Sequence, residues 1–175
     1  MNSFPNPPSW DELFMRHVYL VASKSKENRT RVGAILVKGK SVCAEGYNGI
    51  VPGVGDDIDI LPERYIRPEK YFWQEHAERN ALYDCSVRGQ VSVGTTMYTS
   101  GWPCSDCTRG VIRCGISELV LHKQWMDYEE EFTRDKWEEQ SRRSRIMLAE
   151  ACVRVRILDN FLNLDAYLDG RVIKV

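Results

Sequence analysis

The chain has 175 residues, of which 43% are hydrophobic, enough to form the core of one sizeable domain. Its 24 lysine and arginine residues are balanced by 25 aspartate and glutamate residues, and this balance argues against a nucleic acid as the main partner. The N-terminus lacks the pattern of a signal peptide, and no stretch approaches the roughly 18 apolar residues of a membrane span. We therefore expect one cytoplasmic domain over residues 1–175, with a core at about 9–158 and a C-terminal extension at 159–175.

The first predicted elements are a helix and a β-hairpin. Ser9 and Glu12 have the spacing of a capping box, so a helix is expected to begin there and to end near Ser25. One face is predicted to pack on a sheet, because residues recur at helical spacing at Trp10, Leu13, Phe14, His17, Val18 and Val21. The β-prone runs 32–37 and 42–47 are separated by a Lys-Gly-Lys-Ser segment that suits a hairpin connection.

A long irregular segment at 50–75 follows this hairpin. A connection of this length usually has a function or contains a short helix. The aromatic run at 71–73 is expected to pack beside the site. Asn48 and Gly49, just before the segment, suit a simple turn, and they can also have a functional role.

The second half of the chain alternates between helical and β-prone patterns. A last helix is expected within the tail at 159–175, which contains several apolar residues. The other predicted helices and strands are helices at 75–87, 103–115 and 127–151, and strands at 95–100, 118–122 and 153–158.

Four residues at two predicted helix starts have the chemistry of a metal site. Cys104 and Cys107 are separated by one helical turn, so both thiols can reach one ion, and His76 supplies a third ligand. Three protein ligands leave one position of a tetrahedral Zn²⁺ open for water, whose pKa falls to about 7. Glu78 leaves the helix beside the ion, where a carboxyl group can transfer protons. The pattern therefore predicts a catalytic zinc site.

The alternative is a structural zinc site with a fourth cysteine ligand. Cys114 lies two helical turns beyond Cys107, a rise of about 10 Å, which places it too far from the ion. Cys85 lies nine residues after His76 and is no closer. The four cysteines outside the motif are expected to be small buried hydrophobic residues.

An H-x-E motif followed by P-C-x-x-C is the signature of zinc-dependent nucleobase deaminases. Beyond it, the sequence resembles the deoxycytidylate (dCMP) deaminases of the cytidine deaminase superfamily, from about Trp10 to Leu121. The motifs that carry the resemblance are V-G-A at 32–34, G-Y-N-G at 46–49, G-D-D at 55–57, H-A-E-R-N-A at 76–81, M-Y at 97–98 and P-C-x-x-C at 103–107.

The resemblance implies an α/β fold, the cytidine deaminase-like three-layer α/β/α sandwich with a five-stranded mixed sheet. It implies the hydrolysis of dCMP, or of a 5-substituted dCMP, to dUMP with release of ammonia. Zn²⁺ would be the catalytic cofactor, and a homohexamer regulated by dCTP and by dTTP with Mg²⁺ would be typical. Val54 stands where some members have a cysteine, so a second zinc is not expected.

The resemblance also implies roles for residues outside the metal site. Asn48 would contact the sugar hydroxyl group, and the backbone of Ala77 would contact the base. The phosphate would be bound in the segment before V-G-A, where the candidates are Ser25, Lys26, Arg29 and Arg31. The allosteric nucleotide would bind near the G-Y-N-G turn and the loop after it, where the candidates are Gly46, Tyr47, Asn48, Gly49 and Asp57.

Three other functions remain open at this point. A deaminase of tRNA adenosine or of single-stranded cytidine would share the zinc site, but should also have a basic groove with aromatic platforms. A deaminase of purines or of riboflavin-pathway pyrimidines would differ only in its substrate. A nucleotide sensor or assembly module without catalysis would not require Glu78.

Overall fold

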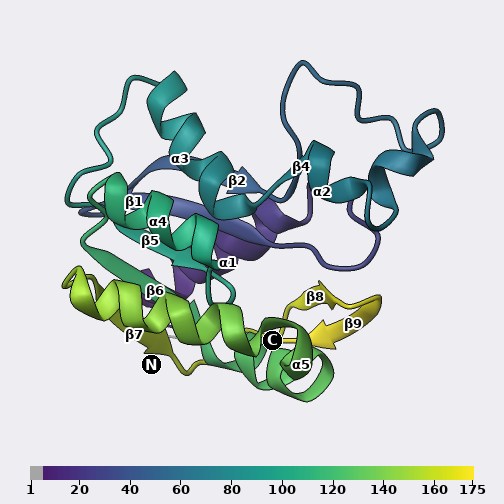
Figure 1. The fold of residues 1–175 in the computed structure, drawn as a ribbon. Helices are drawn as coiled ribbons and strands as arrows, with labels where there is room; N and C mark the ends of the chain where they lie inside the picture. Colours follow the sequence, from purple (N-terminus) through teal and green to yellow (C-terminus); the bar gives the residue numbers. More distant parts are fainter. Residues whose placement is uncertain (1–5) are drawn as a thin grey trace.

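The computed structural model describes residues 6–175, without the side chains of residues 134–136. Figure 1 shows a central sheet with helices on both of its faces. The helices are α1 (Trp10–Ala22), the 3₁₀ helix η1 (Pro62–Tyr65), α2 (Lys70–Trp73), α3 (Ala77–Val87), α4 (Ser105–Arg113) and α5 (Lys123–Glu150). The strands are β1 (Gly33–Lys38), β2 (Ser41–Tyr47), β3 (Gly49–Ile50), β4 (Gln74–Glu75), β5 (Thr96–Thr99), β6 (Glu118–His122), β7 (Arg154–Leu158), β8 (Asp165–Leu168) and β9 (Arg171–Lys174).

The main sheet has five strands in the order β2-β1-β5-β6-β7. β1 is antiparallel to both β2 and β5, whereas β5, β6 and β7 run parallel. The sheet is therefore mixed, as predicted. Since β5 leads directly into α4, the start of α4 lies at the carboxyl end of a parallel strand, where open α/β sheets commonly bind ligands.

Two hydrophobic clusters cover the two faces of the sheet. One contains Phe14 and Val18 of α1 with Ile35 of β1. The other contains Leu36 of β1 with Ala81 of α3, together with residues of α4 and α5. Neighbouring residues of β1 thus enter opposite clusters, because side chains alternate along a strand. The predicted three-layer α/β/α architecture is confirmed.

Helix α1 begins as predicted. The Ser9 hydroxyl group accepts a hydrogen bond from the backbone N–H of Glu12, and the Glu12 carboxylate accepts one from the N–H of Ser9. The buried face differs from the predicted one, because Trp10 and Leu13 are exposed. The residues that α1 buries are Phe14, Met15, Val18, Tyr19, Val21 and Ala22.

The C-terminal extension forms a β-hairpin, and the predicted short helix is wrong. β8 and β9 pair antiparallel on either side of Asp169 and Gly170, which both have positive φ. Ala166 and Leu168 are buried and alternate with exposed residues, a pattern with the period of a strand. The extension therefore packs into the same cluster as α1.

Several smaller predictions also need correction. The aromatic run at 71–73 is exposed, with Phe72 80% accessible, so it is not packed as expected. Helix α4 begins two residues later than predicted and α5 begins four residues earlier. Of the four cysteines outside the motif, Cys85 is buried, whereas Cys152 is exposed.

Among residues 6–175, no helix is both long enough and apolar enough to cross a bilayer.

Candidate active site

His76 is held at the start of α3 by two neighbouring segments. The short pairing of β3 with β4 fixes the chain just before it, with Gly49 opposite Glu75. Gly46 of β2 lets α3 lie directly on the sheet, because a Cβ atom there would be only 2.3 Å from the backbone nitrogen of Ala81. His76 itself is the N-cap residue, with extended backbone geometry. The imidazole position therefore depends on contacts between segments about 30 residues apart in the sequence.

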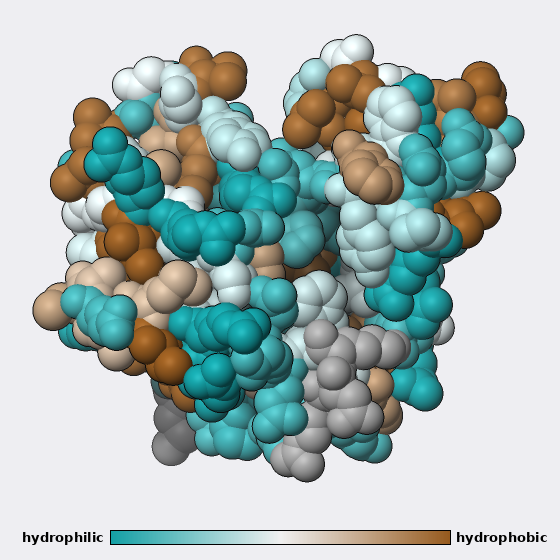
Figure 2. Space-filling view, in the orientation of Figure 1, coloured by the Kyte–Doolittle hydropathy of each residue, from teal (hydrophilic) through white to brown (hydrophobic). Residues whose placement is uncertain are grey.

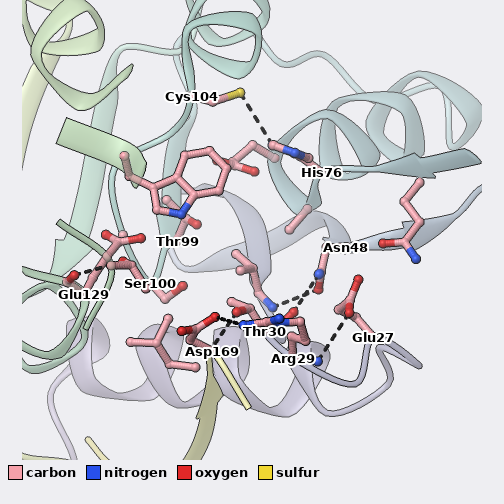
Figure 3. Close-up of a pocket in the computed structure, with 18 of the residues that line it drawn as sticks. Glu27, Arg29, Thr30, Asn48, His76, Thr99, Ser100, Cys104, Glu129 and Asp169 are labelled. Atoms are coloured by element: carbon pink, nitrogen blue, oxygen red, sulfur yellow. Dashed lines mark hydrogen bonds and ion pairs between the residues drawn. The ribbon is translucent and has the colours of Figure 1, made fainter. Parts of the chain in front are cut away.

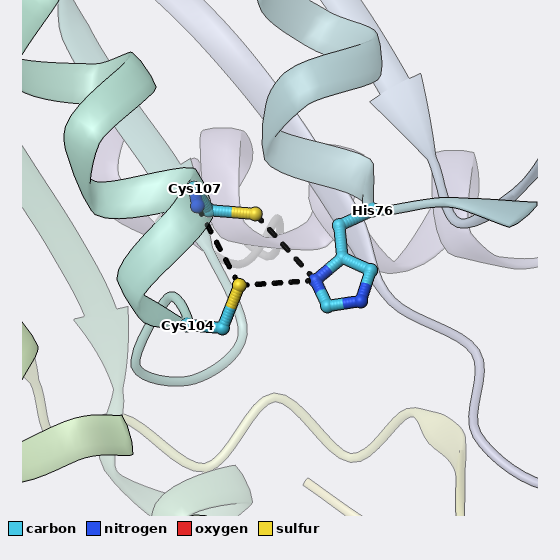
Figure 4. Close-up of side chains that lie close together, drawn as sticks. All are labelled: His76, Cys104 and Cys107. Carbon is cyan, nitrogen blue, oxygen red and sulfur yellow. Dashed lines mark hydrogen bonds between the residues drawn. The ribbon is translucent and has the colours of Figure 1, made fainter. Parts of the chain in front are cut away.

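The two motif cysteines meet this imidazole at the start of α4 (Figure 4). Cys104 is the N-cap residue, and its sulfur accepts a hydrogen bond from the backbone N–H of Cys107. Both Sγ atoms lie 3.5 Å from Nδ1 of His76. The three ligand atoms lie within 4.8 Å of one another, and no other group of this kind is found in the described part of the chain. The predicted convergence of the three side chains is confirmed.

This donor set fits Zn²⁺. Two thiolates and one imidazole are typical zinc ligands, and a thiolate must be deprotonated to bind. Hydrogen bonds from Cys107 and His76 lower the pKa of the Cys104 thiol to about 3, although burial opposes this. Cys85 and Cys114 are not part of the group, so the alternative with a fourth cysteine ligand finds no support.

Glu78 lies at the second position of α3, and its side chain is only 5% exposed. Burial raises the pKa of its carboxyl group, and the nearby His76 partly offsets this effect. A carboxyl group with a raised pKa beside a metal group is suited to accept and return a proton. Its position agrees with the role that the sequence predicts.

A cavity opens from the metal group into the molecule (Figure 3). His76, Ala77, Glu78 and Cys104 line it at the metal end. In the space-filling view, the surface is hollowed between the parts formed by α3 and by the segment around α2, and hydrophilic residues gather there (Figure 2). The opening is therefore surrounded by hydrophilic residues, whereas apolar atoms form most of the cavity lining.

Asn48 also lines this cavity. Its Oδ1 atom accepts a hydrogen bond of 2.8 Å from the N–H of Val32, and its Nδ2 donates one of 2.8 Å to the carbonyl oxygen of Thr30. These bonds fix the orientation of the amide and leave its second N–H free for a ligand. Asn48 is thus both part of a turn and part of the cavity wall.

The four phosphate candidates occupy different environments. Arg29 lines the cavity and forms an ion pair with Asp169 of the C-terminal hairpin. The other three do not line it, and each has another partner. The Ser25 hydroxyl group donates to the carbonyl oxygen of Asn48, the Lys26 ammonium group forms an ion pair with Asp56, and the Arg31 guanidinium group donates to the carbonyl oxygen of Glu27.

Sequence reasoning missed a buried ion pair in the cavity wall. Glu27 is 1% exposed and accepts a hydrogen bond of 2.7 Å from Lys70, which lies 43 residues away. Glu27 also accepts from the backbone N–H groups of Asn28 and Arg29, so it shapes the turn that carries Arg29. No local sequence pattern links Lys70 to Glu27.

The family model for the zinc-binding region of cytidine and deoxycytidylate deaminases matches residues 8–123, which is more than half of the chain. The chain belongs to this deaminase family. The matched region contains α1, the metal group, Glu78 and Asn48, so the family match includes the residues at the metal end of the cavity.

Named relatives support the same assignment. A deaminase in the luxG 3′ region of Aliivibrio fischeri, described as uncharacterized, is 32% identical over 146 residues, which are 83% of this chain and 91% of that protein. The ComE operon protein 2 of Bacillus subtilis is 33% identical over 67% of this chain and 61% of that protein. Human deoxycytidylate deaminase is 34% identical over 64% of each chain. The chain thus spans less than two thirds of the last two proteins.

Solved structures show the deaminase fold. The dCMP deaminase of cyanophage S-TIM5, in complex with dCMP and dUMP, has a TM-score of 0.65 and 23% identity, covering 88% of this chain and 100% of that chain. RibD of Acinetobacter baumannii has a TM-score of 0.56 and 19% identity, covering 85% of this chain and 35% of that chain. At these identities the similarity establishes the fold and not the substrate.

The residues expected to bind an allosteric nucleotide have structural roles in this deaminase. Gly46 permits the close approach of α3, and the carbonyl oxygen of Tyr47 accepts a hydrogen bond from Asn80. Gly49 belongs to the short β3 strand, and Asp57 accepts a hydrogen bond from the N–H of Asp59. Regulation through these residues stays a prediction.

Proposed function

We propose that this deaminase converts dCMP and water to dUMP and ammonia. The observation that carries the proposal is a single cavity lined both by metal-ligating residues and by residues that can bind a sugar and a phosphate. His76, Cys104 and Glu78 line the metal end, and Asn48 and Arg29 also line the cavity, with Arg29 on the side away from Cys104 (Figure 3). The deoxycytidylate deaminases among the relatives support this choice of substrate.

At the metal end, His76, Cys104 and Cys107 would hold Zn²⁺. Bound zinc acts as a Lewis acid that activates water for attack on the base. The buried Glu78 carboxyl group accepts a proton from the attacking water and passes it to the ring nitrogen next to the attacked carbon. It then takes the second proton from the hydroxyl group added at that carbon and delivers it to the departing amine, which leaves as ammonia. The N–H of Ala77, at the first position of α3, is available to the base because the first N–H groups of a helix have no partner within it.

At the nucleotide end, Asn48 donates its free amide N–H to a sugar hydroxyl group. Arg29 is the phosphate residue that we retain from the four candidates, because its side chain lines the cavity. Lys70 and Arg67 line the same region and add positive charge to it. A guanidinium group binds a phosphate through two parallel hydrogen bonds, so Arg29 distinguishes a nucleotide from a nucleoside.

The test is a deaminase assay on zinc-loaded protein with dCMP, dCTP, cytidine and deoxycytidine as substrates. The loss of the cytosine absorbance measures turnover. We expect dCMP to be the best substrate. Absence of turnover with every nucleotide, in protein shown to contain zinc, would overturn the proposal. Repeating the assay with dCTP and with dTTP plus Mg²⁺ tests regulation, and light scattering tests the predicted hexamer.

A further inference from the structure

The wall of the cavity formed by α5 contains an acidic group that the proposed reaction does not use. Trp125, Glu129 and Thr133 are spaced by four residues, so they share one face of α5, and all three line the cavity. Ser100 and Gly101, just after β5, line the same wall. Figure 3 shows Glu129 and Ser100 close together, on the opposite side of the cavity from Asn48.

Two polar side chains of this wall, Ser100 and Glu129, lack protein partners among the described residues. The Ser100 side chain is 1% exposed, and its hydroxyl group has no hydrogen-bond partner among the described residues. The Glu129 carboxyl group forms no salt bridge or hydrogen bond with the described residues; only the backbone oxygen of Glu129 accepts a hydrogen bond, from the Thr133 hydroxyl group. Leaving a buried polar group unsatisfied costs free energy, so such groups commonly mark a ligand contact.

The local structure brings the Glu129 carboxylate close to the cavity. A Cβ atom at position 101 would lie 3.0 Å from Oε2 of Glu129 and 2.9 Å from Nε1 of Trp125, so glycine leaves room for both side chains. Burial, with a further contribution from the charge of Glu78, raises the pKa of Glu129 to about 7. A hydrogen-bond donor on a ligand would favour its ionised form.

The proposed orientation of the base determines which edge meets this wall. The ring nitrogen and carbonyl edge faces Glu78 and Ala77, and the sugar lies toward Asn48. The remaining edge of a pyrimidine carries C5 and C6, and it faces the wall that carries Ser100 and Glu129. We infer that Ser100 and Glu129 form a subsite for a hydrogen-bond-donating substituent at C5 of the pyrimidine. A hydroxymethyl group is one such substituent.

This inference rests on the proposed function, and it adds a preference among its substrates. The key comparison is between 5-hydroxymethyl-dCMP and 5-methyl-dCMP, because they differ by one hydroxyl group and occupy a similar volume. A hydrogen bond to a charged group is expected to favour the hydroxymethyl compound in kcat/KM by roughly tenfold or more.

The experiment measures kcat/KM for dCMP and the two 5-substituted nucleotides with wild-type protein and four variants. Glu129→Leu should reduce the ratio of hydroxymethyl to methyl substrate to about one, and Glu129→Gln and Ser100→Ala should lower it by several-fold. Glu131→Gln is the matched control, because it is exposed on the same helix, and it should keep the wild-type ratio. Circular dichroism confirms that each variant is folded.

Two results would overturn the inference. One is a wild-type ratio close to one, and the other is a ratio that neither Glu129→Gln nor Ser100→Ala changes. If dCMP is a good substrate in either case, the proposed function is retained and only the subsite is rejected. If no nucleotide is deaminated, the proposed function fails. Calorimetry then measures the affinities of the same five proteins for the hydroxymethyl and methyl nucleotides, and the ratio of the two affinities tests the subsite in place of the ratio of kcat/KM.

Discussion

The two ends of the cavity are built in different ways. At the metal end, Cys104 and Cys107 come from a single helix start, and His76 and Glu78 come from another. At the nucleotide end, Arg29 lies in a turn that is shaped by Glu27, and Glu27 is paired with Lys70 from a distant segment. The metal end is encoded by local spacing, whereas the nucleotide end depends on long-range contacts.

This difference has a functional consequence. Helix starts fix the ligands with little freedom, so the chemistry of the metal end can stay the same while the opposite wall varies. In this chain the C-terminal hairpin supplies Asp169 to Arg29, and α5 supplies Glu129 to the base wall. Substrate preference should therefore respond to changes in these later segments without loss of the metal.

The largest expected effect is at the metal end. Glu78→Gln removes the proton carrier but keeps its shape, so kcat should fall by a factor of roughly 10² to 10⁴. Zinc content, measured by atomic spectroscopy, should stay at the wild-type level because Glu78 is not in the ligand group. The exposed Glu131→Gln variant is the control and should keep full activity. Near-normal turnover in Glu78→Gln would rule out the proton-transfer role.

The second prediction concerns the nucleotide end. Arg29→Ala removes the phosphate contact, so KM for dCMP should rise by roughly tenfold to a hundredfold, with little change in the activity on deoxycytidine. Asp169→Asn should act in the opposite direction and lower this KM by a few-fold, because it weakens the ion pair that competes with the phosphate.

The control for Arg29 is Arg113→Ala, which removes the same charge from an exposed position on α4. It should leave both substrates unaffected. An equal loss of activity on dCMP and deoxycytidine in Arg29→Ala would show that Arg29 acts on the fold and not on the phosphate.

The same contrast explains what could be predicted from the sequence. The metal group was predictable because cysteines one helical turn apart must share a helix face, and the helix-start signals lie within a few residues. The strands at 33–38 and 118–122 were predictable because each is an apolar run too short for a typical helix and lies next to a glycine-containing turn. These features depend on residues that are near one another in the chain.

Other features required the folded chain. The pairing of Glu27 with Lys70 and the approach of Glu129 to Ser100 depend on how distant segments meet, and no local pattern encodes this. The C-terminal hairpin was different, because its signal was present. Asp169 and Gly170 form a turn dipeptide, and the alternation of Ala166 and Leu168 has the period of a strand.

The third prediction concerns the contact that positions the metal end. Gly46→Ala places a Cβ atom within 2.3 to 2.7 Å of the α3 backbone, which must move away, so the variant should lose about 1–3 kcal/mol of unfolding free energy in urea titrations. Gly49→Ala is the control, because its Cβ atom would meet nothing closer than 3.8 Å. Equal stability of the two variants would mean that α3 does not need this close approach.

The smallest expected effect lies at an ion pair away from the cavity. The Asp11 carboxylate accepts hydrogen bonds from Arg156 at 2.7 and 2.9 Å and from the Tyr98 hydroxyl group at 2.6 Å, which ties α1 to β5 and β7. The bonds from Arg156 and Tyr98 lower the pKa of Asp11 below its usual 3.8, and burial opposes them. Since the pKa is lower in the folded state, this contribution to stability is present above pH 3.8 and is lost as the pH falls through the folded-state pKa.

Asp11→Asn should therefore reduce the free energy of unfolding by about 0.5–1 kcal/mol at pH 7, a value kept small because the pair is partly exposed to solvent. The difference from wild-type protein should shrink when urea titrations are repeated at progressively lower pH below 3.8, whereas kcat at pH 7 should stay unchanged. A difference that is the same at all pH values would mean that the Asp11 charge does not stabilise the fold. A loss of kcat would show that the position of α1 affects the active site, so that catalysis depends on packing outside the cavity as well as on the residues that line it.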